Sequence, residues 1–244
     1  MQTITEKTVR EIALENPASL PVLESFGIDY CCGGGRLFPE ACARAGVDPD
    51  HLRLLIEKAE RDFSARDHRD WRELPLADLI LHIVDKHHAF VRQETPRIAG
   101  LLIKVAAKHG VAHPELHEIE GLFTAIGQEL ATHMMKEEQI LFPYIEGMEE
   151  SARTGAPRPR VCFDSVKRPI ANMIAEHDDA GALLERIREL AGGYRAPQGA
   201  CMSYQALYQA LAGFEHDLRQ HVHLENNILF PRAAAIEEAS YPAW

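Results

Sequence analysis

The last two thirds of the chain carry apolar residues at the three- and four-residue spacing of amphipathic helices. After Pro75, the spacing is followed by Leu76, Leu79, Ile80, Ile83, Val84 and Val91. The pattern predicts four long helices, over about 75–110, 115–149, 165–191 and 203–238. Gly- and Pro-containing segments such as 151–160 separate them. No segment alternates as a strand does, so we predict an all-α fold with an antiparallel four-helix bundle over residues 75–244.

Residues 1–63 predict a smaller helical unit ahead of the bundle. A helix from Pro17 to Phe26 is expected to end at Gly27, and two shorter helices follow over 37–45 and 49–62. Residues 64–74 are charged and lack an apolar period, which predicts a linker. Because so small a unit buries little surface alone, we expect it to pack on the bundle or on a second copy, as in a homodimer.

An internal repeat places the same residues in the second and fourth predicted helices. Residues 133–143 read HMMKEEQILFP and residues 221–231 read HVHLENNILFP. His133 and Glu137, like His221 and Glu225, are four residues apart and therefore share one helix face. A leucine precedes each histidine by three residues, so each pair is expected to face the core. Two buried, ionised glutamates would be costly without a cation, which predicts a metal site.

The first and third helices supply matching histidines. His88 lies 45 residues before His133, and His177 lies 44 residues before His221. Each half is thus a helical hairpin that offers two histidines and one glutamate. We predict two metal ions, each bound by two histidines and bridged by both glutamates. Imidazole with carboxylate suits iron or manganese, and zinc less well. The donor set leaves positions open for a small ligand such as O2 or NO.

Other polar residues near these helices have less defined roles. Periodicity only mildly favours His88 over the neighbouring His87 as the ligand, and His223 should point away from the site. His82 and His109 are also placed outside the site. The acids expected to accept a hydrogen bond from the second ring nitrogen of a ligand are Glu129, Glu176 and Asp217. The alternative for each is a partly solvated acid, and for the whole set a bundle with core histidines and no metal.

Composition excludes several classes of partner. The net charge of -11 argues against nucleic acid and anionic membrane surfaces. No run of 18 apolar residues predicts a spanning helix, and no apolar leader segment is present, so we expect a cytoplasmic protein. Five cysteines without a leader argue against a disulfide framework. The three isolated ones, Cys42, Cys162 and Cys201, are interpreted as ordinary thiols.

Cys31 and Cys32 are adjacent in a turn that continues as Gly33-Gly34-Gly35. Adjacent cysteines in such a turn can form a vicinal disulfide, hold a soft metal, or do neither. The glycines permit unusual backbone angles and could leave both thiols exposed.

These motifs resemble those of hemerythrin-like iron proteins and, more closely, of the repair of iron centres (RIC) family. The segments that carry the resemblance are 29–34, 133–143, 176–178 and 224–227. The resemblance implies a hemerythrin-like bundle with a carboxylate-bridged di-iron centre, and it favours His88 over His87. The implied ligands are His88, His133, Glu137, His177, His221 and Glu225.

The resemblance also implies a function. Members of the family are linked to repair of iron–sulfur clusters damaged by nitrosative or oxidative stress, so the implied partners are damaged iron–sulfur proteins. It further implies a redox or iron-transfer role for the thiols of Cys31 and Cys32. Whether the protein is an enzyme stays open at this stage. The alternatives are a cytoplasmic scavenger or reductase of nitric oxide, a carrier or sensor of O2, and a purely structural bundle.

Overall fold

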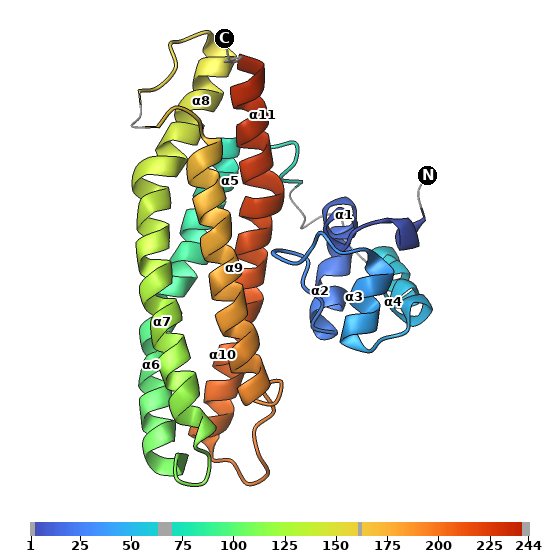
Figure 1. The fold of residues 1–244 in the computed structure, drawn as a ribbon, viewed down its shortest axis with the longest axis vertical. Coiled ribbons are helices and arrows are strands. Elements are labelled where there is room, and N and C mark those ends of the chain that lie inside the picture. Colours follow the sequence, from blue (N-terminus) through green and yellow to red (C-terminus); the bar gives the residue numbers. More distant parts are fainter. Residues whose placement is uncertain (1–2, 63–69, 161–162, 241–244) are drawn as a thin grey trace.

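The computed structural model describes residues 3–62, 70–160 and 163–240. Figure 1 shows a long helical bundle with a smaller helical unit packed against one side. The elements of the bundle are α5 (Leu76–His82), η4 (Ile83–His88), α6 (Ala89–His109), α7 (Glu115–Lys136), η5 (Glu137–Leu141), α8 (Phe142–Thr154), α9 (Lys167–Leu190), α10 (Met202–Leu224), η6 (Glu225–Leu229) and α11 (Phe230–Ser240). Elements that follow one another without a break form four continuous rods, which confirms the predicted four-helix fold.

Three of the four rods contain a π-helical turn, at η4, η5 and η6. The N–H of Phe142 donates to the carbonyl of Glu137, and the N–H of Phe230 donates to that of Glu225, five residues back in each case. A proline follows each phenylalanine, has no N–H, and would clash with a carbonyl four residues back in an α-helix. The wider turn accommodates both prolines, and π turns of this kind often occur at functional sites.

The buried apolar residues form two clusters along the bundle. One surrounds Leu102, Phe123 and Phe214, and the other surrounds Leu79, Phe142 and Phe230. His88, His133, Glu137, His177, His221 and Glu225 fall along their rods between residues of these two clusters or at their border. The polar layer therefore has dry, packed layers on both sides.

The N-terminal unit consists of short helices. They are η1 (Ile4–Glu6), α1 (Val9–Glu15), η2 (Pro17–Ser19), α2 (Leu20–Ser25), α3 (Phe38–Ala45) and α4 (Pro49–Asp62). The single helix predicted from Pro17 to Phe26 is divided into η2 and α2. Helix α1 was not predicted, although Thr8 and Glu11 form a capping box at its start.

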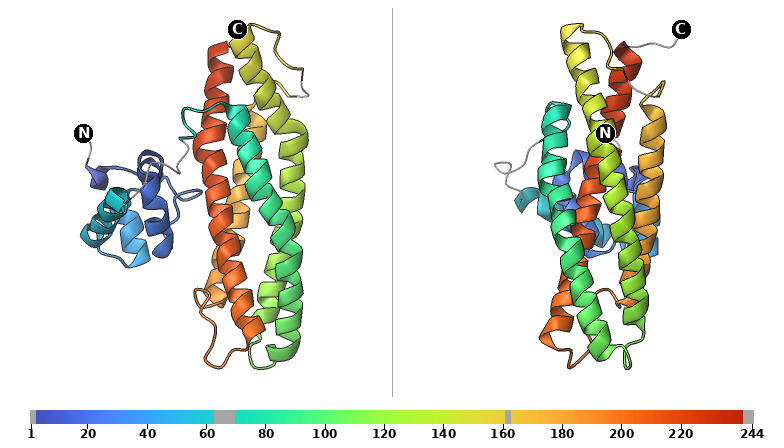
Figure 2. Two further views of the ribbon diagram at one scale, coloured as in Figure 1. Left: turned by 180° about the vertical axis from the view of Figure 1, so that it is seen from behind. Right: turned by 90° about the vertical axis from the view of Figure 1, so that its left-hand side faces the viewer.

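This unit packs on α9, α10 and η6 (Figure 2). Its apolar core is continuous with one cluster of the bundle. The side chain of Asn227 donates to the carbonyl of Tyr30 at 3.2 Å, and His216 lies 2.6 Å from Glu24. Packing on the bundle was one of the two arrangements expected for a unit of this size. In the described part of the chain, no helix is both long and apolar enough to cross a membrane.

Candidate metal centre

Six side chains from all four rods meet in the polar layer of the bundle. One group of possible ligands is His88, His221, Glu137 and Glu225, and the other is His133, His177, Glu137 and Glu225. Within each group, one ligand atom of every residue lies within 4.8 Å of the others. None of the six is more than 2% exposed. The structure thus brings together all six residues proposed as ligands, and both glutamates belong to both groups.

The two carboxylates lie between two pairs of imidazoles. The Nε2 atoms of His88 and His221 are 3.1 Å apart, and those of His133 and His177 are 3.0 Å apart. Glu137 places Oε2 3.4 Å from His88 and Oε1 3.3 Å from His133. Glu225 places Oε1 2.9 Å from His221 and Oε2 3.1 Å from His177. Each glutamate therefore turns one oxygen to each imidazole pair, which is the arrangement that bridging carboxylates need.

Buried oxygens at this centre lack hydrogen-bonding partners. Among the described residues, neither side-chain oxygen of Glu137 has one, nor does Oε2 of Glu225. The imidazoles 3.1 to 3.4 Å from these oxygens pair with them as ions only when protonated. Burying ionised carboxylates with so few hydrogen bonds is costly unless a cation, either a proton on the imidazoles or a metal ion, compensates their charge. The donor set of imidazoles and carboxylates fits iron or manganese, so the residues present match bound metal of this kind.

The electrostatics of the centre also favour positive charge. Burial opposes protonation of His88, but the carboxylates of Glu137 and Glu225 outweigh it and raise its pKa to about 10. Burial likewise opposes protonation of His133, and the charge of Glu137 raises its pKa to about 9. For both glutamates, burial raises the pKa, yet the surrounding histidines bring it below its usual value. The carboxylates are therefore ionised and attract cations, whether protons or metal ions.

Three of the four imidazoles are fixed through their second ring nitrogen. Nδ1–H of His88 donates to Glu138 at 2.6 Å, and Arg92 also contacts that carboxylate. Nδ1–H of His133 donates to Glu176 at 2.8 Å. Such bonds set the ring orientation and leave Nε2 free to bind a metal.

The third fixed imidazole is His177, whose Nδ1–H donates to Oδ1 of Asn226 at 2.8 Å. Of these acceptors, only Glu176 was predicted. Glu138 and Asn226 were missed, although each directly follows a glutamate of the repeat. This equivalent position in the two copies of the repeat was the sequence feature from which both acceptors could have been predicted.

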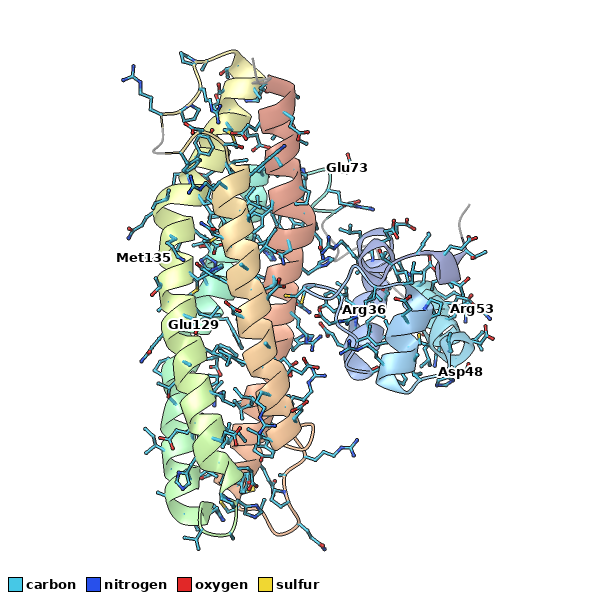
Figure 3. All side chains as sticks on the ribbon, viewed as in Figure 1. Arg36, Asp48, Arg53, Glu73, Glu129 and Met135 are labelled. Atoms are coloured by element: carbon cyan, nitrogen blue, oxygen red, sulfur yellow. The ribbon has the colours of Figure 1, made fainter. Side chains whose placement is uncertain are left out.

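Two other acids take different places from those predicted. Asp217 is buried, but it accepts from His87 at 3.0 Å and not from a proposed ligand. Glu129 on α7 is exposed and makes no contact with the centre (Figure 3). Viewed down the axis of α7, the buried residues near His133 centre about 50° to one side of His133, whereas Glu129 lies about 40° to the other side. Glu129 is therefore turned away from the core.

The remaining histidines also have positions of their own. His87 is fully buried beside the centre. His223 is directed to the N-terminal unit, where its ring contacts that of Tyr30. His109 lies at the far end of the bundle, 3.2 Å from the sulfur of Cys201. The placement of His223 and His109 away from the six residues agrees with expectation.

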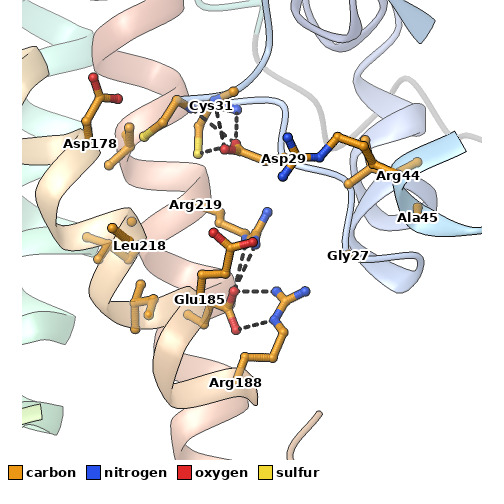
Figure 4. A pocket seen from close by; sticks show the side chains of 18 of the residues that line it. Gly27, Asp29, Cys31, Arg44, Ala45, Asp178, Glu185, Arg188, Leu218 and Arg219 are labelled. Atoms are coloured by element: carbon orange, nitrogen blue, oxygen red, sulfur yellow. Dashed lines mark hydrogen bonds and ion pairs between the residues drawn. The ribbon is translucent and has the colours of Figure 1, made fainter. Parts of the chain in front are cut away.

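Cys31 and Cys32 border a cavity of about 800 Å³ between the N-terminal unit and the bundle (Figure 4). Both are free thiols. The thiol of Cys31 donates to Asp29 at 3.0 Å, and that of Cys32 donates to the backbone carbonyl of His177 at 3.6 Å. The thiol pair therefore touches the backbone of a proposed metal ligand.

The Cys31 thiol is held in its protonated form. The hydrogen bond with Cys32, burial, and the charge of Asp29 together raise its pKa well above the usual value. Since the thiolate is the reactive form, Cys31 is a poor nucleophile at neutral pH. Asp178 and Arg219 of the bundle line the same cavity (Figure 4).

Comparisons with known proteins agree with this architecture. The family model of the hemerythrin HHE cation binding domain matches residues 79–233. A second model, ScdA_N, described as a domain of unknown function, matches residues 5–60. The chain is 38% identical over 229 residues to the iron-sulfur cluster repair protein YtfE of Pectobacterium atrosepticum, covering 93% of this chain and 96% of that protein. It is 37% identical over 234 residues to the YtfE protein of Salmonella paratyphi B, covering 95% and 98%.

The chain belongs to the YtfE family. This confirms the resemblance inferred from the sequence motifs. The hemerythrin match includes all six residues of the centre, and membership in that family implies that the bundle binds iron. The ScdA_N match includes Cys31 and Cys32. In YtfE relatives the two parts occur together over nearly the full length of the chain.

Proposed function

We propose that His88, His133, Glu137, His177, His221 and Glu225 bind two iron ions, with both glutamates as bridges. The observation that carries this proposal is the pair of buried carboxylates, each of which presents one oxygen to each imidazole pair. Bound iron supplies a redox-active centre with positions open to small ligands. The protein positions the donors, keeps water out with the apolar layers, and fixes three imidazoles through Glu138, Glu176 and Asn226.

We further propose that this protein repairs iron–sulfur clusters damaged by nitrosative or oxidative stress, in the cytoplasm. Support comes from the printed function of its YtfE relatives, which it matches over most of its length. Its partners are then damaged iron–sulfur proteins. In this role Cys31 and Cys32 serve as redox or transfer thiols, since they border a cavity that is also lined by His177.

The proposed organisation has two domains. Residues 1–63 form the smaller domain, 64–74 a linker, and 75–244 the bundle. In support, α4 ends at Asp62 and α5 begins at Leu76. The family matches also end at 60 and begin at 79. Most of the proposed linker lies outside the described residues.

The repair proposal can be tested with the iron-loaded protein and an enzyme whose iron–sulfur cluster has been damaged by nitric oxide. Recovery of enzyme activity should exceed that given by the same amount of free ferrous iron. Glu137→Gln should abolish the excess. Glu150→Gln is a matched control, because Glu150 is an exposed glutamate on the same rod and pairs with Arg153. Equal recovery with free iron and with the loaded protein would contradict the proposal.

A second candidate function is the binding or reduction of nitric oxide. It is favoured by the donor count, since each group offers four residues to metals that commonly take six ligands. Mixing the reduced, iron-loaded protein with nitric oxide separates the two activities. Stable nitrosyl absorption without N2O indicates a scavenger, whereas catalytic N2O formation indicates a reductase. Absence of both would exclude this candidate.

A further inference from the structure

The duplicated halves of the bundle should surround the six residues with matching contacts. The repeat pairs His88 with His177, His133 with His221, and Glu137 with Glu225. It likewise pairs the residues that follow the glutamates, Glu138 and Asn226, and those that precede the first-helix histidines, His87 and Glu176. The contacts His88–Glu138 and His177–Asn226 obey this relation.

The relation fails at one contact. His133 donates to Glu176, so His221 should donate to His87. Instead, Nε2 of His87 has no hydrogen-bonding partner among the described residues, and the two rings lie nearly parallel, with centroids 5.7 Å apart and an angle of 11° between the planes. No hydrogen bond therefore joins His221 to His87. The Nδ1 of His221 is buried and has no hydrogen-bonding partner within the described ranges.

Asp217 holds the ring of His87 in place, so His87 does not turn toward His221. Nδ1 of His87 lies 3.0 Å from Asp217, which accepts its proton. Asp217 is the repeat counterpart of Glu129, which points to solvent in the other half. The His87–Asp217 pair thus exists in one half alone, and it leaves one of the four imidazoles without an acceptor.

An acceptor on the second ring nitrogen strengthens metal binding, and its loss typically costs about 10–100-fold in affinity. The pair His133 and His177 has two acceptors, whereas the pair His88 and His221 has one. Exposure does not separate the pairs, because all four imidazoles are at most 2% exposed. His177 borders the cavity at the thiols, and His87, the neighbour of His88, borders a second cavity of about 530 Å³.

We propose that the two ligand groups are unequal, and that the group containing His88 and His221 binds ferrous iron more weakly and releases it first. This rests on the proposed two-iron centre. A protein that gives up one ion in this way keeps the other between Glu137 and Glu225. The buried carboxylates then stay compensated, and the bundle stays folded while iron is delivered.

The test follows iron release rather than repair activity. The protein is loaded anaerobically with two equivalents of Fe(II) and mixed with an excess of a chromogenic ferrous chelator. Two phases of equal amplitude are expected, with rates about 10–100-fold apart. His221→Ala should keep one iron that leaves at the slow rate, and His133→Ala should keep one that leaves at the fast rate. Equal rates in these two variants would overturn the proposal.

Two further variants address the missing acceptor itself. His87→Gln introduces an amide oxygen on a side chain as long as that of Glu176, and it should slow the fast phase alone. Glu176→Ala removes the acceptor of His133 and should accelerate the slow phase alone, with helix content by circular dichroism as the check on folding. An unchanged fast phase in His87→Gln together with an unchanged slow phase in Glu176→Ala would also overturn it.

The outcomes distinguish this inference from the proposed function. Binding of fewer than two irons by the wild-type protein would remove the two-iron centre and, with it, the inference. Binding of two irons by the wild-type protein, together with equal release rates from the His221→Ala and His133→Ala variants, would leave the centre intact and remove only the inequality.

Discussion

The metal centre and the thiol cavity are two regions that differ in how the chain builds them. The six residues of the centre project from four rods of one bundle and are at most 2% exposed. The cavity instead lies between the N-terminal unit and the bundle, and its thiols stand on a loop. The positions of the centre's residues follow from helix periodicity, which can be recognised in the sequence. The cavity depends on how the N-terminal unit docks on the bundle, which is much harder to predict from the sequence.

The two regions also differ in charge. Two ionised carboxylates sit in the centre and raise the pKa of nearby histidines. At the cavity, the hydrogen bond with Cys32, burial and the charge of Asp29 raise the pKa of the Cys31 thiol and keep it neutral. The carboxylates of the centre are therefore ionised and attract cations, whereas the Cys31 thiol at the cavity stays protonated and uncharged. If the two regions are separable, a change in one should leave the other intact.

The largest effect is expected when both bridging carboxylates are removed. Glu137→Leu combined with Glu225→Leu should abolish iron binding, because the remaining histidines lack both bridges. Without the carboxylates that raise their pKa, the buried histidines can stay neutral and leave no unpaired charge in the core, so the metal-free variant should stay folded. Iron content by elemental analysis and thermal unfolding measure the two effects. Iron retained at two equivalents would show that the metal binds elsewhere.

A complementary change should affect the cavity alone. Cys31→Ser combined with Cys32→Ser should leave iron content and visible absorption unchanged, since neither sulfur belongs to the groups of possible ligands. Recovery of a damaged cluster enzyme should fall if the thiols take part in transfer. A matched control is Cys42→Ser, which removes a buried thiol of the N-terminal unit away from the cavity. Loss of iron in the double variant would contradict the separation of the two regions.

Much of the fold and of the centre could be predicted because each rests on short-range rules. The spacing of Leu76, Leu79 and Ile83 places a helix face, and the spacing of His133 and Glu137 places two ligands on one side. Phe-Pro at 142–143 and 230–231 follows two of the π turns, but Pro96 lies inside α6 without one and η4 contains no proline, so proline alone does not predict them.

The parts that could not be predicted depend on long-range packing. Asp217 and Glu129 occupy equivalent positions of the repeat, yet one is buried against His87 and the other is exposed. Both acids precede the ligand histidine by four residues, so spacing alone does not separate them; Asp217 is bound by His87 of the neighbouring rod, whereas the repeat counterpart of His87 is an acid, Glu176. The contact of Cys32 with His177 joins residues 145 positions apart. Such a contact follows from the docking of the N-terminal unit, not from any local motif.

The pH dependence of the metal-free protein provides a test of the centre's charge. The pKa of His88 is raised to about 10 and that of His133 to about 9 in the folded state, above the usual value of 6.5. Their contribution to stability is therefore complete below pH 6.5 and is lost as the pH rises through about 9 to 10. Denaturant unfolding of the metal-free protein should show this decline.

The iron-loaded protein should behave differently over the same range. Bound histidines carry no proton on the donor nitrogen, so the decline should be much smaller. Metal affinity should rise with pH near neutrality, because binding displaces protons from the histidines. A parallel loss of stability in the loaded and metal-free forms would place the titrating groups outside the centre.

The smallest effect is expected from Asp29→Asn at the cavity. Asp29 accepts from the backbone N–H groups of Cys31, Cys32 and Gly33 and from the Cys31 thiol. Asparagine keeps one acceptor oxygen for the turn but removes the negative charge that helps to raise the pKa of Cys31. Alkylation of Cys31 at pH 8 should therefore become a few-fold faster, roughly in proportion to the increase in its thiolate fraction. Peptide mass spectrometry follows each cysteine separately, and Cys42 is the internal control. A slower rate at Cys31, with Cys42 unchanged, would mean that Asp29 acts on the thiol as a base and not as a repelling charge.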